Sequence, residues 1–212
     1  MAIANQGPLG PFKGKLGPIH GYIRNGKPII SAFPRVVRPR TEKQKAVLQR
    51  MQVLSPFFNL ISPYLAIGFE LSAIKNDNSA NNSAKSYNLK NAIKGEYPDQ
   101  ELDYPKIRLT EGMLPIAENA HVTAVQNGLQ FNWTYDQSNQ LDNSDDKTML
   151  LAFFPDEKIR FYMISGVERK QCQQILEIDP MMKGQEAETY ISFITDDRKA
   201  ISNSVYTGKV AF

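Results

Sequence analysis

The chain has 212 residues, with a hydrophobic content of 42%, a charged content of 22% and a formal net charge of +3. These values are ordinary for a folded protein and exclude a wholly disordered chain. No run approaches the roughly 20 apolar residues that span a bilayer, and the first residues lack the apolar core of a signal peptide. We therefore expect no membrane span and synthesis in the cytoplasm. The single cysteine, Cys172, excludes an internal disulfide.

The charge is divided unevenly along the chain. Residues 1–50 carry ten basic residues against one acidic residue, Glu42, which gives +9 and leaves −6 for the rest of the +3 total. A basic segment joined to an acidic body can bind nucleic acid, an acidic protein surface or the body of a neighbouring copy. The candidate binding residues are Lys13, Lys15, Arg24, Lys27, Arg35, Arg38, Arg40, Lys43, Lys45 and Arg50.

Residues 1–40 are predicted to form an extended basic arm with two similar turns at its glycines. A short repeat of glycine, leucine, proline and a basic residue covers residues 7–21, where Pro8, Pro11 and Pro18 disfavour a helix. Its apolar residues cannot bury much surface within so short a segment. We therefore expect them to anchor the arm on the body or on another subunit; these anchors are Leu9, Phe12, Leu16 and Ile19.

A β-hairpin is predicted within this arm, from Tyr22 to Ile30. Apolar residues flank the pair Asn25-Gly26, which favours the tight turn between two twisted strands. A proline-rich link follows over residues 33–40 and is expected to stay extended.

Residues 41–103 are predicted to be helical, beginning with a capping box over residues 41–44. An apolar stripe follows at intervals of four and three residues, the spacing of one helical face. Its members are Val47, Met51, Leu54, Phe58, Ile61 and Leu65. Because proline disfavours a helix interior, Ser55-Pro56 and Ser62-Pro63 predict breaks, giving two or three short helices over residues 41–75. Another helix is expected from Ala84 to Ile93, ended by Gly95.

After Tyr104 the apolar spacing changes from helical to alternating. Strands are predicted at 106–110, 120–126, 129–135, 148–154, 158–164, 173–178, 187–194 and 200–206. Tight connections are expected at Asn127-Gly128, at 155–157 and at 196–198. Short strands at this spacing indicate an antiparallel β-sandwich over residues 104–212. The predicted fold class is therefore α+β: an arm with a hairpin, short helices and a sandwich.

The patterns that mark catalytic or metal sites are missing from the sequence. The two histidines, His20 and His121, do not occur in a zinc-binding or nucleophile-relay pattern. The acidic segment 136–146 supplies oxygen ligands without the register of a calcium loop, so a solvated loop is favoured and ion binding stays open. We expect no catalytic, cofactor-binding or metal-ligating residue, no cofactor, and a protein that is not an enzyme.

The glycine-rich arm, Pro39-Arg40-Thr41, residues 86–95 (SYNLKNAIKG) and residues 202–206 (SNSVY) form a specific combination. Together they resemble a family of uncharacterised Bacteroidota proteins, filed as a domain of unknown function. In that family the arm reads like G-x-L-G-G-F-S-G-K-x-G, where this chain has Pro11 and Lys13 in place of Gly and Ser. The resemblance implies no known activity.

Two looser resemblances concern architecture. Trp133 and Tyr190 are similar in position to the core Trp and the strand-F Tyr of immunoglobulin-like and fibronectin type III domains, which implies a sandwich of that kind. The Pro-Arg-Thr segment with its following helix is similar to segments of some phage virion proteins, which implies an assembly subunit.

Three functions are open on the sequence alone. In the first, which we favour, the sandwich is the body and the basic arm docks on copies of the chain or on a larger virion-like particle. In the second, a nucleic-acid-associated protein uses the basic stretch 35–50, although aromatic residues for base stacking are not interleaved there. In the third, a glycan- or ligand-binding sandwich uses loop aromatics such as Tyr135. The first predicts that the cytoplasmic product is incorporated into a particle.

Overall fold

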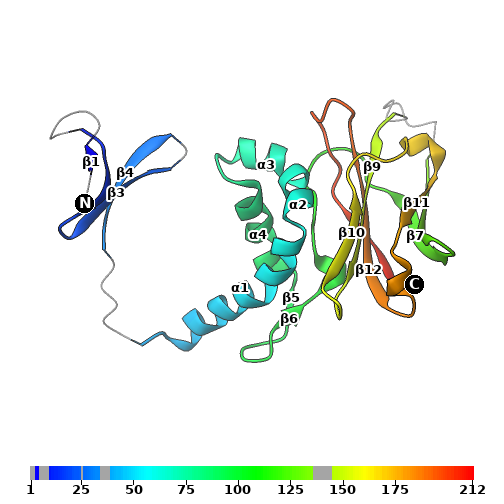
Figure 1. The fold of residues 1–212 in the computed structure, drawn as a ribbon, viewed down its shortest axis with the longest axis horizontal. Helices are drawn as coiled ribbons and strands as arrows, with labels where there is room; N and C mark the ends of the chain where they lie inside the picture. Colours follow the sequence, from blue (N-terminus) through cyan, green and yellow to red (C-terminus); the bar gives the residue numbers. More distant parts are fainter. Residues whose placement is uncertain (1–2, 5–9, 25, 34–38, 136–144) are drawn as a thin grey trace. The chain divides into compact units, whose positions relative to one another are not determined.

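The computed structural model describes residues 3–4, 10–24, 26–33, 39–135 and 145–212. The chain divides into two compact units, residues 1–41 and residues 42–212. The fold class is α+β, as predicted, with short helices and mainly antiparallel sheets (Figure 1). Among the described residues, no helix is both long enough and apolar enough to cross a bilayer.

The N-terminal unit is a four-stranded antiparallel sheet in the order β1-β2-β3-β4. Its strands are β1 (Ile3–Ala4), β2 (Phe12–Leu16), β3 (Ile19–Arg24) and β4 (Lys27–Ala32). The predicted hairpin is confirmed, because Arg24 in β3 pairs with Lys27 in β4. Within the predicted arm, β2 folds back on β3 through a turn at Gly17-Pro18, and the sequence did not predict this strand pairing. Strand pairing satisfies main-chain groups that an isolated arm would leave to water.

The helical region contains α1 (Glu42–Leu60), α2 (Ser62–Gly68), α3 (Glu70–Lys75) and α4 (Ala80–Asn91). The break predicted at Ser62-Pro63 is confirmed, since α2 begins there with the proline in its first turn. The break predicted at Ser55-Pro56 is wrong, because Pro56 lies inside α1. An interior proline costs a helix about 3 kcal/mol. Leu54, Phe57 and Phe58 are all buried around it, and their packing offsets that cost.

Helix α4 begins four residues before the predicted start at Ala84. Ser79 caps it, with a side-chain oxygen that accepts a hydrogen bond from the amide of Asn82. The polar composition of this first turn concealed it, because a run of Asn and Ser is typical of loops. A two-stranded sheet of β5 (Ile93–Lys94) and β6 (Glu101–Leu102) follows α4.

Two larger antiparallel sheets lie face to face in residues 104–212. One has the order β11-β8-β7, and the other has the order β10-β9-β12-β13. Their strands are β7 (Glu118–Val125), β8 (Gly128–Thr134), β9 (Lys147–Phe154), β10 (Ile159–Met163), β11 (Gln173–Glu177), β12 (Glu186–Ile194) and β13 (Val205–Ala211). Phe131 and Trp133 of the first sheet share one apolar cluster with Phe154 and Phe193 of the second.

Two predicted strands and one predicted turn need correction. The predicted strand 106–110 instead holds part of a short 3-10 helix, η1 (Tyr104–Lys106), followed by irregular chain. The strand predicted at 200–206 runs from Val205 to Ala211. The turn between β7 and β8 is Gln126-Asn127, one residue earlier than predicted, because Val125 pairs with Gly128. The predicted connections at 155–157 and 196–198 are confirmed as antiparallel returns.

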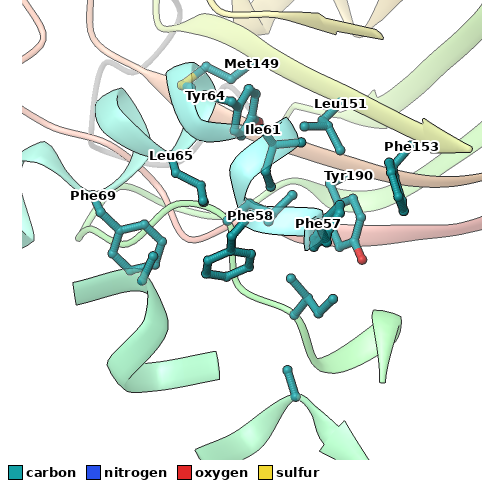
Figure 2. Close-up of a cluster of buried hydrophobic side chains, with 14 of the residues drawn as sticks. Phe57, Phe58, Ile61, Tyr64, Leu65, Phe69, Met149, Leu151, Phe153 and Tyr190 are labelled. Carbon is teal, nitrogen blue, oxygen red and sulfur yellow. The ribbon is translucent and has the colours of Figure 1, made fainter. Parts of the chain in front are cut away.

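A helical layer covers the outer face of the β10-β9-β12-β13 sheet, so the body has three layers (Figure 1). Figure 2 shows Phe57, Ile61 and Tyr64 of the helices beside the strands, with Phe58 and Leu65 in the same cluster. The sheet side of this cluster is formed by Met149, Leu151, Phe153 and Tyr190. Alternate residues of β9 and β12 therefore face the helices and the second sheet, and both strands are buried almost throughout.

Candidate functional site

The N-terminal sheet has two chemically different faces. Side chains alternate between the faces of a strand, and residues paired across strands share a face. The register pairs Lys15 with His20, Tyr22 with Ile29 and Arg24 with Lys27 on one face. It pairs Leu16 with Ile19 and Ile23 with Pro28 on the other. This sorting is a property of the sheet and follows from neither the repeat nor the charge count.

We call the second face the apolar face; it consists of Phe12, Leu16, Ile19, Ile23, Pro28 and Ile30. Leu16, Ile23 and Ile30 are 56%, 59% and 59% exposed. Phe12 belongs to this face because its ring crosses Gly21, where an added Cβ would lie 2.9 Å from the ring. Three of the four predicted anchors, Phe12, Leu16 and Ile19, therefore lie on one surface. The fourth, Leu9, is outside the described residues.

We call the first face the basic-aromatic face; it consists of Lys15, His20, Tyr22, Arg24, Lys27 and Phe33. The His20 and Tyr22 rings are stacked, with centroids 5.3 Å apart and planes at 18°. The Phe33 ring lies 5.0 Å from the His20 ring, and the Lys15 Nζ lies 4.9 Å above the Phe33 ring. Such a cation–ring contact keeps the ammonium beside the rings while leaving it open to an anion.

By the same alternation, Lys13 lies on the side of Lys15 in β2 and is exposed there. The remaining predicted basic residues lie outside the N-terminal strands: Arg40 is exposed before α1, and Lys43 is exposed in its first turn. Lys45 forms an ion pair with Glu42 at 2.8 Å, and the hydrogen bond that it donates to that carboxylate raises the pKa of Lys45. Arg50 is half-buried. Arg35 and Arg38 lie outside the described residues, so the stretch 35–50 is not described as one surface.

Two of the segments that carry the family resemblance, residues 86–95 and 202–206, both contact residues 107–112 of the body. From residues 86–95, the Asn88 side chain donates to the Arg108 carbonyl at 2.8 Å and accepts from the Arg108 amide at 2.9 Å. From residues 202–206, Ser204 Oγ accepts from the Leu109 amide at 2.8 Å, and the Ser202 carbonyl accepts from Thr110 Oγ1 at 2.7 Å. These groups take the place of the neighbouring strand that we predicted as the hydrogen-bond partner of residues 106–110. The two segments therefore have a structural role.

A polar pocket of about 390 Å³ lies beside α3 and α4. Its lining includes Ser72, Asn76, Ser83, Tyr87 and Glu111. Ser72 Oγ donates to Glu111 at 3.1 Å, and the Arg108 guanidinium covers one face of the Tyr87 ring at 3.9 Å. The pocket offers hydroxyl, amide and carboxylate groups to a polar ligand. Tyr135, the aromatic residue suggested for ligand binding, lies instead after β8 and is not in this lining.

A buried ion pair stands at one end of the sandwich. Arg169 and Asp146 are each 5% exposed, with 3.5 Å between Nη2 and Oδ2. The guanidinium also donates to the Pro115 carbonyl at 2.7 Å and lies 3.8 Å above the Phe193 ring. Burial raises the pKa of Asp146 although Arg169 opposes the rise, and burial lowers the pKa of Arg169. Desolvation therefore outweighs the attraction between the two charges.

The described residues contain no group of three or more His, Cys, Asp and Glu side chains arranged to hold a metal ion. His20 is stacked on Tyr22, and His121 lies in β7 opposite Asn132 of β8, where its side chain is exposed. Most of the acidic segment, residues 136–144, lies outside the described residues. The sequence reasoning missed the group of rings formed by His20, Tyr22 and Phe33, whose signal was the spacing of His20, Tyr22 and Arg24 at every second residue of β3.

A family model for a family of unknown function, DUF6266, matches residues 12–208. The chain belongs to this family. The match begins at the first residue of β2 and ends within β13, so it includes both faces of the N-terminal sheet and the three-layered body. A search of curated proteins gave no match.

Proposed function

We propose that the chain is a non-enzymatic assembly protein, whose N-terminal unit docks through its apolar face on another copy of the chain. The observation that carries this proposal is the gathering of Phe12, Leu16, Ile19, Ile23 and Ile30 on one face of a single-layered sheet. A sheet with an apolar face is stabilised when a second layer covers that face. Within residues 1–41, the described strands form one layer and supply no second one.

Burial of the apolar face would contribute part of the free energy that docking requires. Full burial of a Leu or Ile side chain contributes about 1.5–3 kcal/mol, and three such side chains are more than half exposed on the apolar face. Covering all three contributes about 3–5 kcal/mol before the cost of association. A stable complex therefore needs further contacts, which several copies assembled together can provide.

The distribution of charge favours a second copy as the partner. Residues 1–41 contain seven Lys and Arg and no Asp or Glu, so they carry +7 and leave −4 of the +3 total for residues 42–212. The N-terminal unit of one molecule and the body of another therefore attract each other. Because such attraction is screened by salt, association is expected to slow as the ionic strength rises.

We propose that the body of this assembly protein is an immunoglobulin-like module. In chain order, its first, second and fifth strands form one sheet, and its third, sixth and seventh form the other, as in immunoglobulin domains. The fourth strand, β10, pairs with β9, as an added strand does in variable domains. Trp133 lies in the sandwich core but in the second strand, β8, whereas the immunoglobulin Trp lies in the third. Tyr190 of the sixth strand faces the helical layer and donates to the Tyr104 carbonyl. We infer a cytoplasmic product of a Bacteroidota bacterium that is incorporated into a virion-like particle.

The test is size-exclusion chromatography with light scattering on the full chain, at low and high salt. Ile23→Thr combined with Ile30→Thr removes apolar surface while keeping the branched side chains that strands favour. This double variant and a deletion of residues 1–41 are expected to run as monomers, whereas the full chain forms a larger species. The matched control is Ile74→Thr, at a residue of α3 that is 73% exposed. A full chain that is monomeric at every salt concentration, or a double variant that assembles normally, would contradict the proposal.

A further inference from the structure

We propose that the basic-aromatic face of the N-terminal sheet binds single-stranded nucleic acid. This face is the reverse of the apolar face, so the inference does not depend on the proposed assembly. Three cations, Lys15, Arg24 and Lys27, occur on it. Residues 1–41 contain no Asp or Glu, so the unit is uniformly basic.

The rings explain why the partner is nucleic acid in preference to an acidic protein. Unpaired bases stack on aromatic side chains, and positively charged groups beside the rings bind the phosphates. His20, Tyr22 and Phe33 form a continuous group of rings, with centroid separations of 5.3 and 5.0 Å between neighbours. Phe33 is 41% exposed although its ring is apolar. An acidic protein surface would use the cations and leave the rings without a role.

The same rings favour a single strand over a duplex. In a duplex the base faces are stacked on one another, so side-chain rings reach them only after strand separation. A four-stranded sheet that presents aromatic side chains is a known platform for unpaired bases. Strand β3 has six residues and spans about 20 Å. That length matches about six phosphates of a stacked strand, at roughly 3.4 Å each.

The structure favours this face over the stretch 35–50, which the sequence suggested. Lys45 is paired with Glu42, and Arg50 is half-buried. The described part of that stretch, residues 39–50, contains no aromatic residue. The rings and cations needed for a single strand therefore occur together in β2 to β4 and at Phe33.

The experiment is fluorescence anisotropy of a fluorescein-labelled 12-nucleotide single strand of mixed sequence, titrated with the full chain between 50 and 200 mM salt. Three phosphate contacts predict that log K falls with log salt at a slope of about −2. Tyr22→Val keeps strand propensity and removes one ring, and it is expected to weaken binding about tenfold. Lys15→Gln combined with Arg24→Gln is expected to weaken binding and to reduce the slope to about −0.7.

Two controls separate this result from bulk charge and from assembly. Lys75→Gln combined with Lys183→Gln changes the net charge equally at exposed residues of the body and is expected to leave binding unchanged. The Ile23→Thr, Ile30→Thr variant, altered on the apolar face, is expected to bind the labelled oligonucleotide with unchanged affinity. Failure of assembly would therefore leave this proposal standing. Equal loss in the body control, no effect of Tyr22→Val, a duplex bound as tightly as the single strand, or no binding at 50 mM salt would each overturn it.

Discussion

Asn88 joins two segments of the chain through one side-chain amide. Its Nδ2 donates both to the Ala84 carbonyl of its own helix and to the Arg108 carbonyl, at 2.8 Å in each case. Its Oδ1 accepts from the Arg108 amide at 2.9 Å, and the residue is fully buried. No helix or strand partner satisfies Arg108, so its main chain depends on this amide. A buried amide that satisfies irregular backbone is costly to remove.

We predict that Asn88→Ala lowers the free energy of unfolding by about 2–4 kcal/mol, because it leaves the Arg108 amide and carbonyl without partners and opens a cavity. Urea unfolding followed by circular dichroism measures the change. Asn91→Ala is the control, since Asn91 makes a similar bond to the Tyr87 carbonyl on the exposed side of α4. The control is expected to cost less than about 0.5 kcal/mol. Equal costs for the two variants would contradict the structural role of Asn88.

A second residue-scale prediction concerns the buried pair of Arg169 and Asp146. Arg169→Met leaves the Asp146 carboxylate buried without its partner, so we expect a loss of about 3–5 kcal/mol. Adding Asp146→Leu removes the unpaired charge and is expected to restore most of that loss. Unfolding of the two single variants and the double variant gives the coupling energy. A double variant less stable than Arg169→Met would contradict the prediction, because Asp146 would then stabilise the fold without Arg169.

The Arg169–Asp146 pair also makes the folding stability depend on pH. Because the pKa of Asp146 is raised in the folded state, the folded chain holds a proton that the unfolded chain has released. The stability from this group is therefore present below the ordinary Asp pKa and is lost as pH rises through the raised value. In Asp146→Leu that component should vanish, and unfolding measured at several acidic pH values tests this.

At the scale of elements, helices α1 and α2 and the β10-β9-β12-β13 sheet stabilise each other by burying a shared apolar surface. Met149, Leu151, Phe153 and Tyr190 are buried under α1 and α2, at 4% exposure or less. We predict that residues 42–212 fold without the N-terminal unit, whereas residues 104–212 alone expose this surface and aggregate. Dye binding to exposed apolar surface and thermal unfolding compare the two fragments. A soluble, cooperatively unfolding fragment 104–212 would contradict the prediction.

Sequence patterns predicted the elements whose signal is local. The hairpin of β3 and β4 followed from its Asn-Gly turn, and the strands of the sandwich followed from alternating or continuous apolar runs. The errors occurred where distant residues decide the conformation. Pro56 stays helical because of tertiary packing, and residues 107–110 lack strand partners because Asn88 and Ser204 bind their backbone. Neither effect leaves a mark in the local pattern.

Several residues of the candidate site were predicted from the sequence, but their arrangement on two faces was not. The anchors Phe12, Leu16 and Ile19 and the cations Lys15 and Arg24 were identified from the sequence. Their separation onto opposite faces depends on the pairing of β2 with β3, which an extended arm does not have. Once that register is known, the rings and the cations come together on the same face.

At the scale of the whole molecule, buried tyrosines limit stability in alkali. Burial raises the pKa of Tyr104 to about 12 and raises the pKa of Tyr64, Tyr190 and Tyr206 as well. Above the ordinary pKa of about 10, the unfolded chain loses protons that the folded chain keeps. Stability from these four groups is therefore complete below pH 10 and falls as pH rises toward 12 and beyond.

We accordingly predict that these tyrosines ionise together with unfolding. Absorbance at 295 nm and circular dichroism are measured on the same samples between pH 9 and 13. Tyr206→Phe removes one such group, together with its hydrogen bond to Glu188 at 2.5 Å. Ionisation of all the tyrosines near pH 10, with the dichroism unchanged, would contradict the prediction.

Strands β9 and β12 lie in the middle layer, paired on both edges and covered on both faces. Water reaches the amide hydrogens of such strands only when the whole body opens. Their exchange with deuterium should therefore be the slowest in the chain and should proceed at one common free energy. That free energy equals the global stability of residues 42–212, so these two strands report it under native conditions without any denaturant.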